Sequence, residues 1–196
     1  MSEAPLAVGR RVIVTGLAGS GKSTFALALA AKTGLPVVHL DLHFWKPGWV
    51  APSEIEWREK QRGILDGNAW IADGNYAETL DLRLERADTV VLLDMPWWLC
   101  AGRALRRGFR MPEELPEGCT YSAWQRLRDE WCVAVRIWRK RHSEPERERE
   151  TVSGHGQHVA VHVLRSQRAI VEFLDGLTAE SPASSIGASE SGRSLL

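Results

Sequence analysis

Short apolar runs alternate with longer amphipathic stretches along most of the chain. The apolar runs predict buried strands at 10–16, 36–41, 69–74, 87–94 and 158–164. Helical spacing of apolar residues predicts helices at 21–34, 52–67, 96–110, 122–142 and 167–174. This alternation predicts an α/β protein with a five-stranded parallel sheet and helices on both faces. Ligands of such a sheet bind at the carboxyl ends of its strands, so functional residues are expected there.

Two further segments stand out by residue type, one rich in tryptophan and one fully charged. Trp124, Trp131 and Trp138 recur every seven residues, which places them on one side of a helix. Such an aromatic stripe predicts core packing rather than a platform for a ligand. The charged run RERE at 147–150 predicts solvated surface.

Composition narrows the class of protein. The chain has 196 residues, enough for one well-buried domain, and 25 basic residues balance 25 acidic ones. The zero formal net charge argues against a general nucleic-acid or membrane-surface binder, which would carry a basic excess. No apolar run is long enough for a membrane span, no signal-peptide core is present, and the three cysteines form no disulfide framework. We therefore expect a cytoplasmic domain at 1–177 and a disordered tail, rich in Ser, Ala, Gly and Glu, at 178–196.

The first predicted strand runs into the sequence GLAGSGKST, which matches the phosphate-binding pattern G-x-x-x-x-G-K-[ST]. Glycines let successive backbone N–H groups turn toward phosphate oxygens, and the start of the following helix adds its dipole. Lys22 is expected to reach the β- and γ-phosphates, and the Ser23 hydroxyl to ligate Mg²⁺. The predicted nucleotide-binding residues of this loop are Gly16, Ala18, Gly19, Ser20, Gly21, Lys22, Ser23 and Thr24. The chain is therefore expected to bind ATP and Mg²⁺ in a three-layer P-loop NTPase fold.

Four arginines without an acidic neighbour lie in the segment RALRRGFR at 103–110. At about 100° per residue they fall on one face of a helix. The closest acidic residues in sequence are Asp94, before the segment, and Glu113, after it. Solvated helix faces normally mix charges of both signs, so this stripe predicts an anion site.

The residues after the third and fourth predicted strands resemble those of adenylate kinases. That family has an Asp-Gly pair after its third strand and Asp-x-Pro after its fourth, with arginines seven and eleven residues beyond the proline. Here these positions are Asp73, Pro96, Arg103 and Arg107. The resemblance implies that Asp73 contacts Mg²⁺ through water and that the two arginines hold the transferring phosphates. It further implies a short helical lid at about 108–122, an acceptor-binding arm at about 42–67, and a position for Arg165 beside the adenine.

A closer resemblance covers most of residues 11–175. The segments GSGKST, LPVVHLDLHFWKPGW, WIADGNYAETLDLRLERADTVVLLDMPWWLC and HVLRS are similar to small bacterial adenylate kinase-related proteins, often described as DNA topology modulation proteins. Because several separate motifs occur in order, the resemblance implies the P-loop kinase fold and the use of a nucleotide. It implies much less about the acceptor.

The acceptor side departs from the kinases it resembles. Adenylate kinases follow Asp-Gly with Phe-Pro-Arg, whereas this chain reads DGNYAETLDLR, and Arg83 is the candidate replacement for that arginine. Asp41 resembles the aspartate with which shikimate kinases receive the acceptor's hydroxyls; it orients an acceptor hydroxyl, acts as base, or only caps a helix or turn. The other candidate substrate-binding residues are Trp45, Asp73, Asn75, Tyr76, Arg136 and Arg139. Packing of the arm for Trp45, and solvated helix surface for the two arginines, stay open as alternatives.

Three histidines, His155, His158 and His162, lie around a glycine and a predicted strand without a nearby cysteine or carboxylate cluster. They are expected to be ordinary loop and sheet residues rather than metal ligands.

Together these features predict an ATP-dependent kinase that moves the γ-phosphoryl group to a small acceptor, namely a nucleoside, nucleotide or other hydroxylated metabolite. Lys22, Arg103 and Arg107 would offset charge on the transferring group, and Ser23 and Asp73 would organise Mg²⁺. Whether Asp41 or Asp73 acts as base stays open. Two other classes also stay open, a nucleotide-dependent DNA-associated regulator and a non-catalytic nucleotide sensor. The zero net charge counts against the first, and the two lid arginines count against the second.

Overall fold

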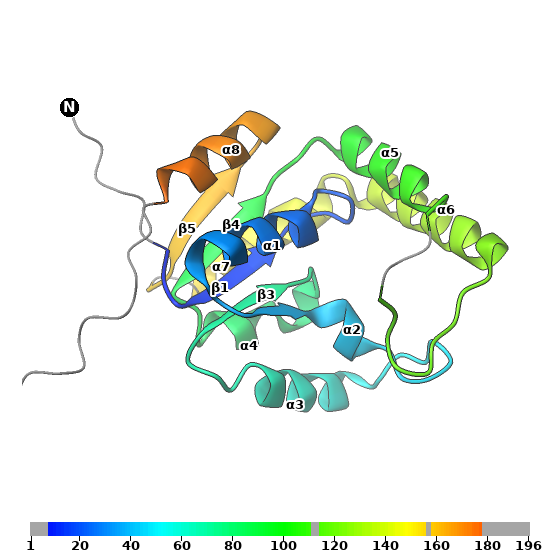
Figure 1. Ribbon diagram of the computed structural model, residues 1–196, viewed down its shortest axis with the longest axis horizontal. Coiled ribbons are helices and arrows are strands. Elements are labelled where there is room, and N and C mark those ends of the chain that lie inside the picture. The colour runs from blue at the N-terminus through cyan, green and yellow to red at the C-terminus, as the bar shows by residue number, and fades with distance from the viewer. Residues whose placement is uncertain (1–7, 111–113, 156–157, 178–196) are drawn as a thin grey trace, which may run out of the picture.

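The computed structural model describes residues 8–110, 114–155 and 158–177. At its centre lies a five-stranded sheet in the order β2-β3-β1-β4-β5, in which every pairing is parallel (Figure 1). The strands are β1 (Arg11–Thr15), β2 (Val37–His39), β3 (Trp70–Asp73), β4 (Thr89–Leu93) and β5 (Ala160–Leu164). The predicted five-stranded parallel sheet is thus confirmed.

Helices cover both faces of this sheet, as predicted. They are α1 (Lys22–Thr33), α2 (Leu40–Phe44), α3 (Glu54–Ile64), α4 (Leu80–Leu84), α5 (Trp97–Arg107), α6 (Ala123–Lys140), α7 (Ser143–His155) and α8 (Gln167–Gly176), with a 3-10 turn η1 (Ala77–Thr79) before α4. Helices α1 and α8 cover one face of the sheet (Figure 1). Val12 and Val14 of β1 point to this face, because they pack with residues of α1 and α8. Ile13 points to the other face and packs with residues of α4 and α7. A strand buried on both faces in this way reads as a continuous apolar run, which is why β1 was recognisable from sequence.

Helix α7 shows that the interpretation of 147–150 as solvated surface is right for three of the four residues and wrong for Glu148. Glu148 is 1% exposed and Val152, one turn later, is 7% exposed, so this side of α7 packs onto the sheet and against α4. The neighbouring charged residues do face water. The run was misread because charge alone does not reveal that one of four charged residues turns inward.

Helix α6 contradicts the prediction that its tryptophans form core. Trp124, Trp131 and Trp138 are 82%, 60% and 53% exposed. The buried side of α6 carries Glu130, Ala134 and Ile137 instead, and this side packs against α5, with which α6 lies side by side (Figure 1). Seven-residue spacing shows that the tryptophans share a face, but it is the face with Ala134, Ile137 and Glu130 that packs against α5.

The predicted lid was expected to be helical. Its described part, 108–110 and 114–122, forms turns and irregular chain instead. Helix α5 ends before it, at Arg107, and helix α6 begins after it, at Ala123. The predicted disordered tail, 178–196, lies outside the described residues. Within the described ranges, none of the helices combines the length and apolar character that crossing a membrane requires.

Candidate nucleotide and acceptor site

The loop between β1 and α1 has the shape that phosphate binding requires. Gly16, Gly19 and Gly21 have φ values of 135°, 79° and 100°, which side-chain-bearing residues rarely adopt. A Cβ added at Gly16 would lie 2.5 Å from the carbonyl oxygen of Leu93, and one added at Gly19 would lie 2.3 Å from that of Cys100. The glycines of the motif are therefore dictated by both backbone conformation and close approach to β4 and α5.

Polar groups of this loop fit a polyphosphate. The Lys22 ammonium donates to the carbonyl oxygens of Gly16 and Leu17, at 2.9 and 3.0 Å, so it curls over the loop. The Ser20 hydroxyl is buried without a hydrogen-bond partner among the described residues. Ser23 and Thr24, in the first turn of α1, are exposed. A loop with its lysine in place, an unsatisfied hydroxyl and a helix N-terminus is suited to an anion.

The two arginines of the adenylate kinase-like spacing have different partners. Arg103 lies beside the loop, where its Nη1 donates to the carbonyl oxygen of Ser20 at 3.2 Å. Arg107 donates to Glu130 from Nε and Nη2, at 2.6 and 2.8 Å. Burial lowers the pKa of Arg107, but the hydrogen bond to Glu130 and the negative charges of Glu130 and Asp41 together outweigh burial and leave that pKa raised. The view of 103–110 as a stripe without acidic partners is thus wrong for Arg107, because Glu130 lies 23 residues away in sequence.

Asp73 ends β3 beside the last residue of β2. His39 and Asp73 are paired in register, and His39 Nδ1 lies 2.8 Å from Asp73 Oδ2. The hydrogen bond to Asp73 raises the pKa of His39, against the opposing effect of burial. His39 was not among the predicted site residues. Its place at a strand end next to Asp73 is the sequence signal that could have found it.

Asp41 and Tyr76, two of the predicted acceptor residues, contact each other. The Tyr76 hydroxyl donates to Asp41 Oδ1 at 2.7 Å, and the Tyr76 ring packs against Phe44 and Trp57, with centroids 4.8 and 5.0 Å away. Burial, together with the negative charge of Asp41, raises the pKa of Tyr76, so its proton stays on the hydroxyl. Asp41 itself is exposed. Two of the predicted acceptor residues therefore lie together, with a carboxylate open to solvent.

The predicted arm touches the predicted lid. Trp45 packs edge-on against Phe44 and Trp49, with centroids 4.9 and 5.7 Å away. The Trp49 ring lies 4.3 Å from that of Tyr121, and its Nε1 donates to the Thr120 carbonyl at 2.8 Å. A row of aromatic rings thus connects the acceptor side to the segment before α6.

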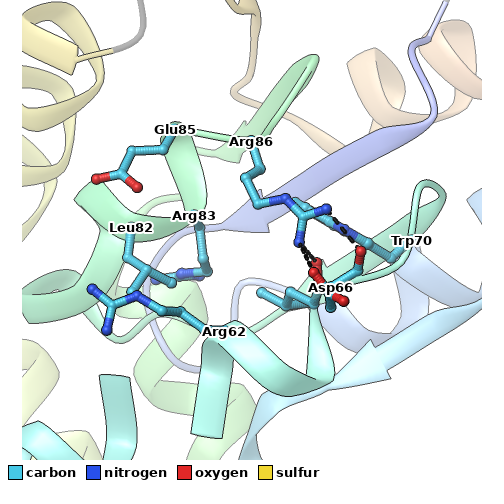
Figure 2. Close-up of a pocket in the computed structure, with 8 residues that line it drawn as sticks. Arg62, Asp66, Trp70, Leu82, Arg83, Glu85 and Arg86 are labelled. Atoms are coloured by element: carbon cyan, nitrogen blue, oxygen red, sulfur yellow. Dashed lines mark hydrogen bonds and ion pairs between the residues drawn. The ribbon is translucent and has the colours of Figure 1, made fainter. Parts of the chain in front are cut away.

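Arg83, the candidate acceptor arginine, lies inside the protein. It is 1% exposed and donates to the carbonyl oxygens of Gly74, Asn75 and Tyr76 at 2.9, 2.8 and 2.9 Å. Burial lowers the pKa of Arg83 to about 10. Arg83 is one of the residues that line a pocket of about 240 Å³, together with Trp70, the first residue of β3 (Figure 2). Arg83 therefore holds the loop after β3 in shape, rather than reaching outward to a substrate.

Helix α7 brings carboxylates that sequence reasoning missed. Glu148 Oε1 accepts a hydrogen bond of 3.2 Å from the Thr15 hydroxyl, at the end of β1. Burial raises the pKa of Glu148 to about 7, although Lys22 and Thr15 favour its charged form. Glu144, one turn earlier, accepts from Asn75 Nδ2 at 2.8 Å. The candidate site thus includes a helix whose sequence looked like plain surface.

A second pocket, of about 380 Å³, lies between the start of the loop and the end of β4. It is lined by Leu17, Asp94, Met95, Pro96, Trp97, Arg141, His142, Pro145 and Arg165. Arg165 Nε lies 3.1 Å from Asp94 Oδ2, and Arg149 pairs with the same carboxylate. Arg136 and Arg139 are exposed on α6 and do not line this pocket. Arg165 and Arg141 both line this pocket, whereas the roles predicted for Arg136, Arg139 and Arg165 stay predictions.

The predicted absence of a histidine metal site remains a prediction. Within residues 8–110, 114–155 and 158–177, no three or more His, Cys, Asp or Glu side chains are arranged to hold a metal ion. His162 packs against the ring of Phe173, 5.0 Å between centroids, and burial lowers its pKa. A Mg²⁺ ion bound to a nucleotide needs fewer protein ligands than such a cluster provides, since phosphate and water fill most of its coordination positions. Ser23 and Asp73 supply oxygen donors of that kind.

Comparison with known proteins supports the fold. The chain is similar to a shikimate kinase from Acinetobacter baumannii solved in complex with shikimate, at 20% identity and a TM-score of 0.51, over 85% of this chain and 89% of that one. It also aligns with a shikimate kinase from Bacteroides thetaiotaomicron at 18% identity and a TM-score of 0.47, over 84% and 94% of the two chains. A sugar kinase from Janibacter sp. HTCC2649 aligns at 20% identity and a TM-score of 0.46, over 85% and 91%. The first of these alignments, together with the parallel sheet and the glycine loop after β1, shows that the chain has the fold of P-loop kinases.

No protein-family model matches the chain, and neither does any curated protein. Membership of the small bacterial adenylate kinase-related proteins, and the DNA topology modulation label, therefore stay predictions.

Proposed function

We propose that the protein is an ATP-dependent kinase that phosphorylates a small hydroxylated acceptor, such as a nucleoside, a nucleotide or another metabolite. The observation that carries the proposal is the position of Arg103, which reaches the phosphate-binding loop at Ser20 from a different helix. A loop that only binds a nucleotide needs no such arginine. A loop that transfers a phosphoryl group does, because charge develops on that group between donor and acceptor.

The residues divide into a donor side and an acceptor side. On the donor side, the loop from Gly16 to Thr24 and Lys22 would hold the phosphates of ATP, and the pocket beside Leu17 with Arg165 adjoins that end of the site. On the acceptor side, Asp41, Asn75 and Tyr76 would contact the acceptor around the end of β3. This division follows the rule that parallel sheets bind ligands at the carboxyl ends of their strands.

In the reaction, the acceptor oxygen forms a bond to the γ-phosphorus while the bond from that phosphorus to the β–γ bridging oxygen breaks, and the acceptor's proton passes to a carboxylate. Asp41, which is exposed and already within hydrogen-bond reach of a hydroxyl, is the candidate recipient, with Asp73 as the alternative. Lys22 and Arg103 offset the charge on the transferring oxygens, and Arg107 joins them if it leaves Glu130. Mg²⁺ held by Ser23 and Asp73 would neutralise phosphate charge when bound.

The test is ATP turnover across a panel of nucleosides, nucleotides and hydroxylated metabolites, with the Lys22→Ala variant as background. We expect at least one acceptor to raise ADP release well above that background, with the phosphorylated acceptor identified by mass. Nucleotide binding without acceptor-dependent turnover would instead leave a nucleotide sensor and reject the kinase.

A further inference from the structure

The outer face of α6 exposes large aromatic side chains to water. Trp124, Trp131 and Trp138 keep 82%, 60% and 53% of their surface exposed. Because they recur every seven residues, they lie in one line along the helix. Isolated exposed apolar residues are ordinary, but a contiguous row of them marks an interaction site. We call these three residues the α6 tryptophan stripe.

The charged residues exposed on the same helix all carry a positive charge. They are Arg128, Arg136, Arg139 and Lys140, whereas the acidic residues of α6 are half-buried or buried. Arg128 pairs with Asp129 at 3.0 Å, and the other three form no ion pair with any residue that the structure describes. At about 100° per residue, Arg128 and Arg139 lie within roughly 80° of Trp131 around the helix, so cations follow one side of the stripe. The zero net charge of the whole chain therefore coexists with a local positive excess on this face.

We propose that the α6 tryptophan stripe and the arginines beside it bind the surface of a bilayer that contains anionic phospholipids. Tryptophan is enriched at the boundary between headgroups and acyl chains, where its ring meets apolar groups and its N–H meets water. Arginine side chains beside it pair with lipid phosphate and carboxylate groups. The binding strength of an interfacial helix grows with its immersed apolar area and with its attraction to anionic lipids, and this face supplies both.

Two observations favour a lipid surface over a single-stranded nucleic acid. Proteins that bind single strands stack the bases on open aromatic faces within a basic groove. Here the Arg141 guanidinium lies over the Trp138 ring, 5.4 Å from its centroid, so one face of that ring is already covered. The three tryptophans also line neither of the two pockets described above. A lipid surface needs no groove to reach side chains on the outer side of a helix.

The first test is cosedimentation of the full-length protein with vesicles of phosphatidylcholine that contain roughly one third phosphatidylserine. We expect binding to these vesicles, weakened by high salt, and little binding to phosphatidylcholine alone. Trp131→Ala should weaken the binding by about tenfold, because its apolar area no longer enters the bilayer. Trp98→Ala is the matched control, since Trp98 is 62% exposed on α5, outside the stripe, and this variant should bind like wild type. Circular dichroism verifies that both variants fold.

A second pair of variants tests the contribution of charge. Arg139→Gln should weaken binding to the anionic vesicles by about fivefold, as expected for a basic residue close to such a surface. Arg62→Gln is the matched control, because Arg62 is exposed on a different helix, α3, and its loss should change binding little. Equal losses in the two variants would mean that only the total charge of the chain matters, and would overturn the proposal.

The third test uses Cys132, which is exposed next to Trp131, whereas Cys100 and Cys119 are buried. The emission of an environment-sensitive fluorophore attached to Cys132 should shift to shorter wavelength when the anionic vesicles are added. The same fluorophore on Arg62→Cys, in a Cys132→Ser background, should show no shift. Absence of wild-type binding to the anionic vesicles, equal binding to neutral ones, or undiminished binding of Trp131→Ala overturns the proposal. So does binding of a short single-stranded DNA that Trp131→Ala abolishes, without binding to vesicles, because the stripe would then serve that partner.

Discussion

Arg107 on α5 and Glu130 on α6 form a two-bonded ion pair, with Nε–Oε1 and Nη2–Oε2 distances of 2.6 and 2.8 Å. The Glu130 carboxylate is buried, and Arg126 Nη2 also approaches it at 3.5 Å. One carboxylate thus pairs with two guanidinium groups, which leaves a net positive charge, and it joins α5 to α6. Because Arg107 is itself half exposed, it can exchange this partner for a phosphate without first being uncovered.

Removing the Glu130 charge should destabilise the fold. Glu130→Gln leaves Arg107 and Arg126 without their shared counter-charge, and we expect a loss of about 1–3 kcal/mol, below the 3–5 kcal/mol of a fully buried pair because Arg107 reaches water. Asp129→Asn is the matched control, because it breaks an exposed pair with Arg128 on the same helix and should cost less than about 1 kcal/mol. Urea unfolding of the three proteins measures both values. Equal losses would show that Glu130 contributes no more than a surface charge.

Arg103 should matter for turnover and little for stability. Arg103→Ala removes the guanidinium beside Ser20, and we expect kcat with the best acceptor to fall by about 10³, as for other arginines that offset charge in phosphoryl transfer. Its Tm should stay close to that of wild type. Arg106→Ala, an exposed neighbour in the same stripe, should keep near-normal kcat. If both variants lose activity equally, the stripe acts only through its overall charge.

The sheet and the phosphate-binding loop could be predicted because their signals are local. The run from Arg11 to Thr15 and the glycines after it each specify structure within a few residues. The partners of the site could not be predicted, because they are brought together by packing. The Thr15 hydroxyl donates to Glu148, which lies 133 residues later in the sequence. No residue pattern in or near β1 indicates that α7 packs there. The same reason explains why the acidic partner of Arg107 was missed.

The tryptophans of α6 show a different limit of sequence reasoning. Their spacing correctly places them on one face, but periodicity carries no information about which face packs on the neighbouring helix. Ala134 and Ile137 share the buried side of α6, where α5 approaches closely, and the tryptophans are left outside. An apolar stripe therefore predicts burial only when the helix has no other face that can pack.

Arg83 should prove a structural residue that controls the acceptor loop. Arg83→Lys keeps the charge but cannot donate to the carbonyl oxygens of Gly74, Asn75 and Tyr76 at once, so we expect a loss of about 1–3 kcal/mol of unfolding free energy. Arg62→Lys, at an exposed position of the pocket in Figure 2, should change stability by less than about 0.5 kcal/mol. Acceptor KM should rise for Arg83→Lys alone. An unchanged Tm with a raised KM would instead assign Arg83 to direct contact with the acceptor.

Glu148 should make stability depend on pH in the direction opposite to that of most carboxylates. Burial raises its pKa in the folded protein to about 7, from an ordinary value of 4.5. Between these two pH values the folded protein keeps a proton that the unfolded chain has released, so the unfolding free energy falls as the pH rises through this window. The difference corresponds to about 3 kcal/mol at 1.36 kcal/mol per pKa unit. Glu148→Gln cannot ionise but can still accept the bond from Thr15, so it should match wild type near pH 4.5 and exceed it in stability by up to that amount at pH 8. Urea unfolding of both proteins at the two pH values measures the effect, and a difference that does not change with pH would mean that Glu148 is not the group that titrates.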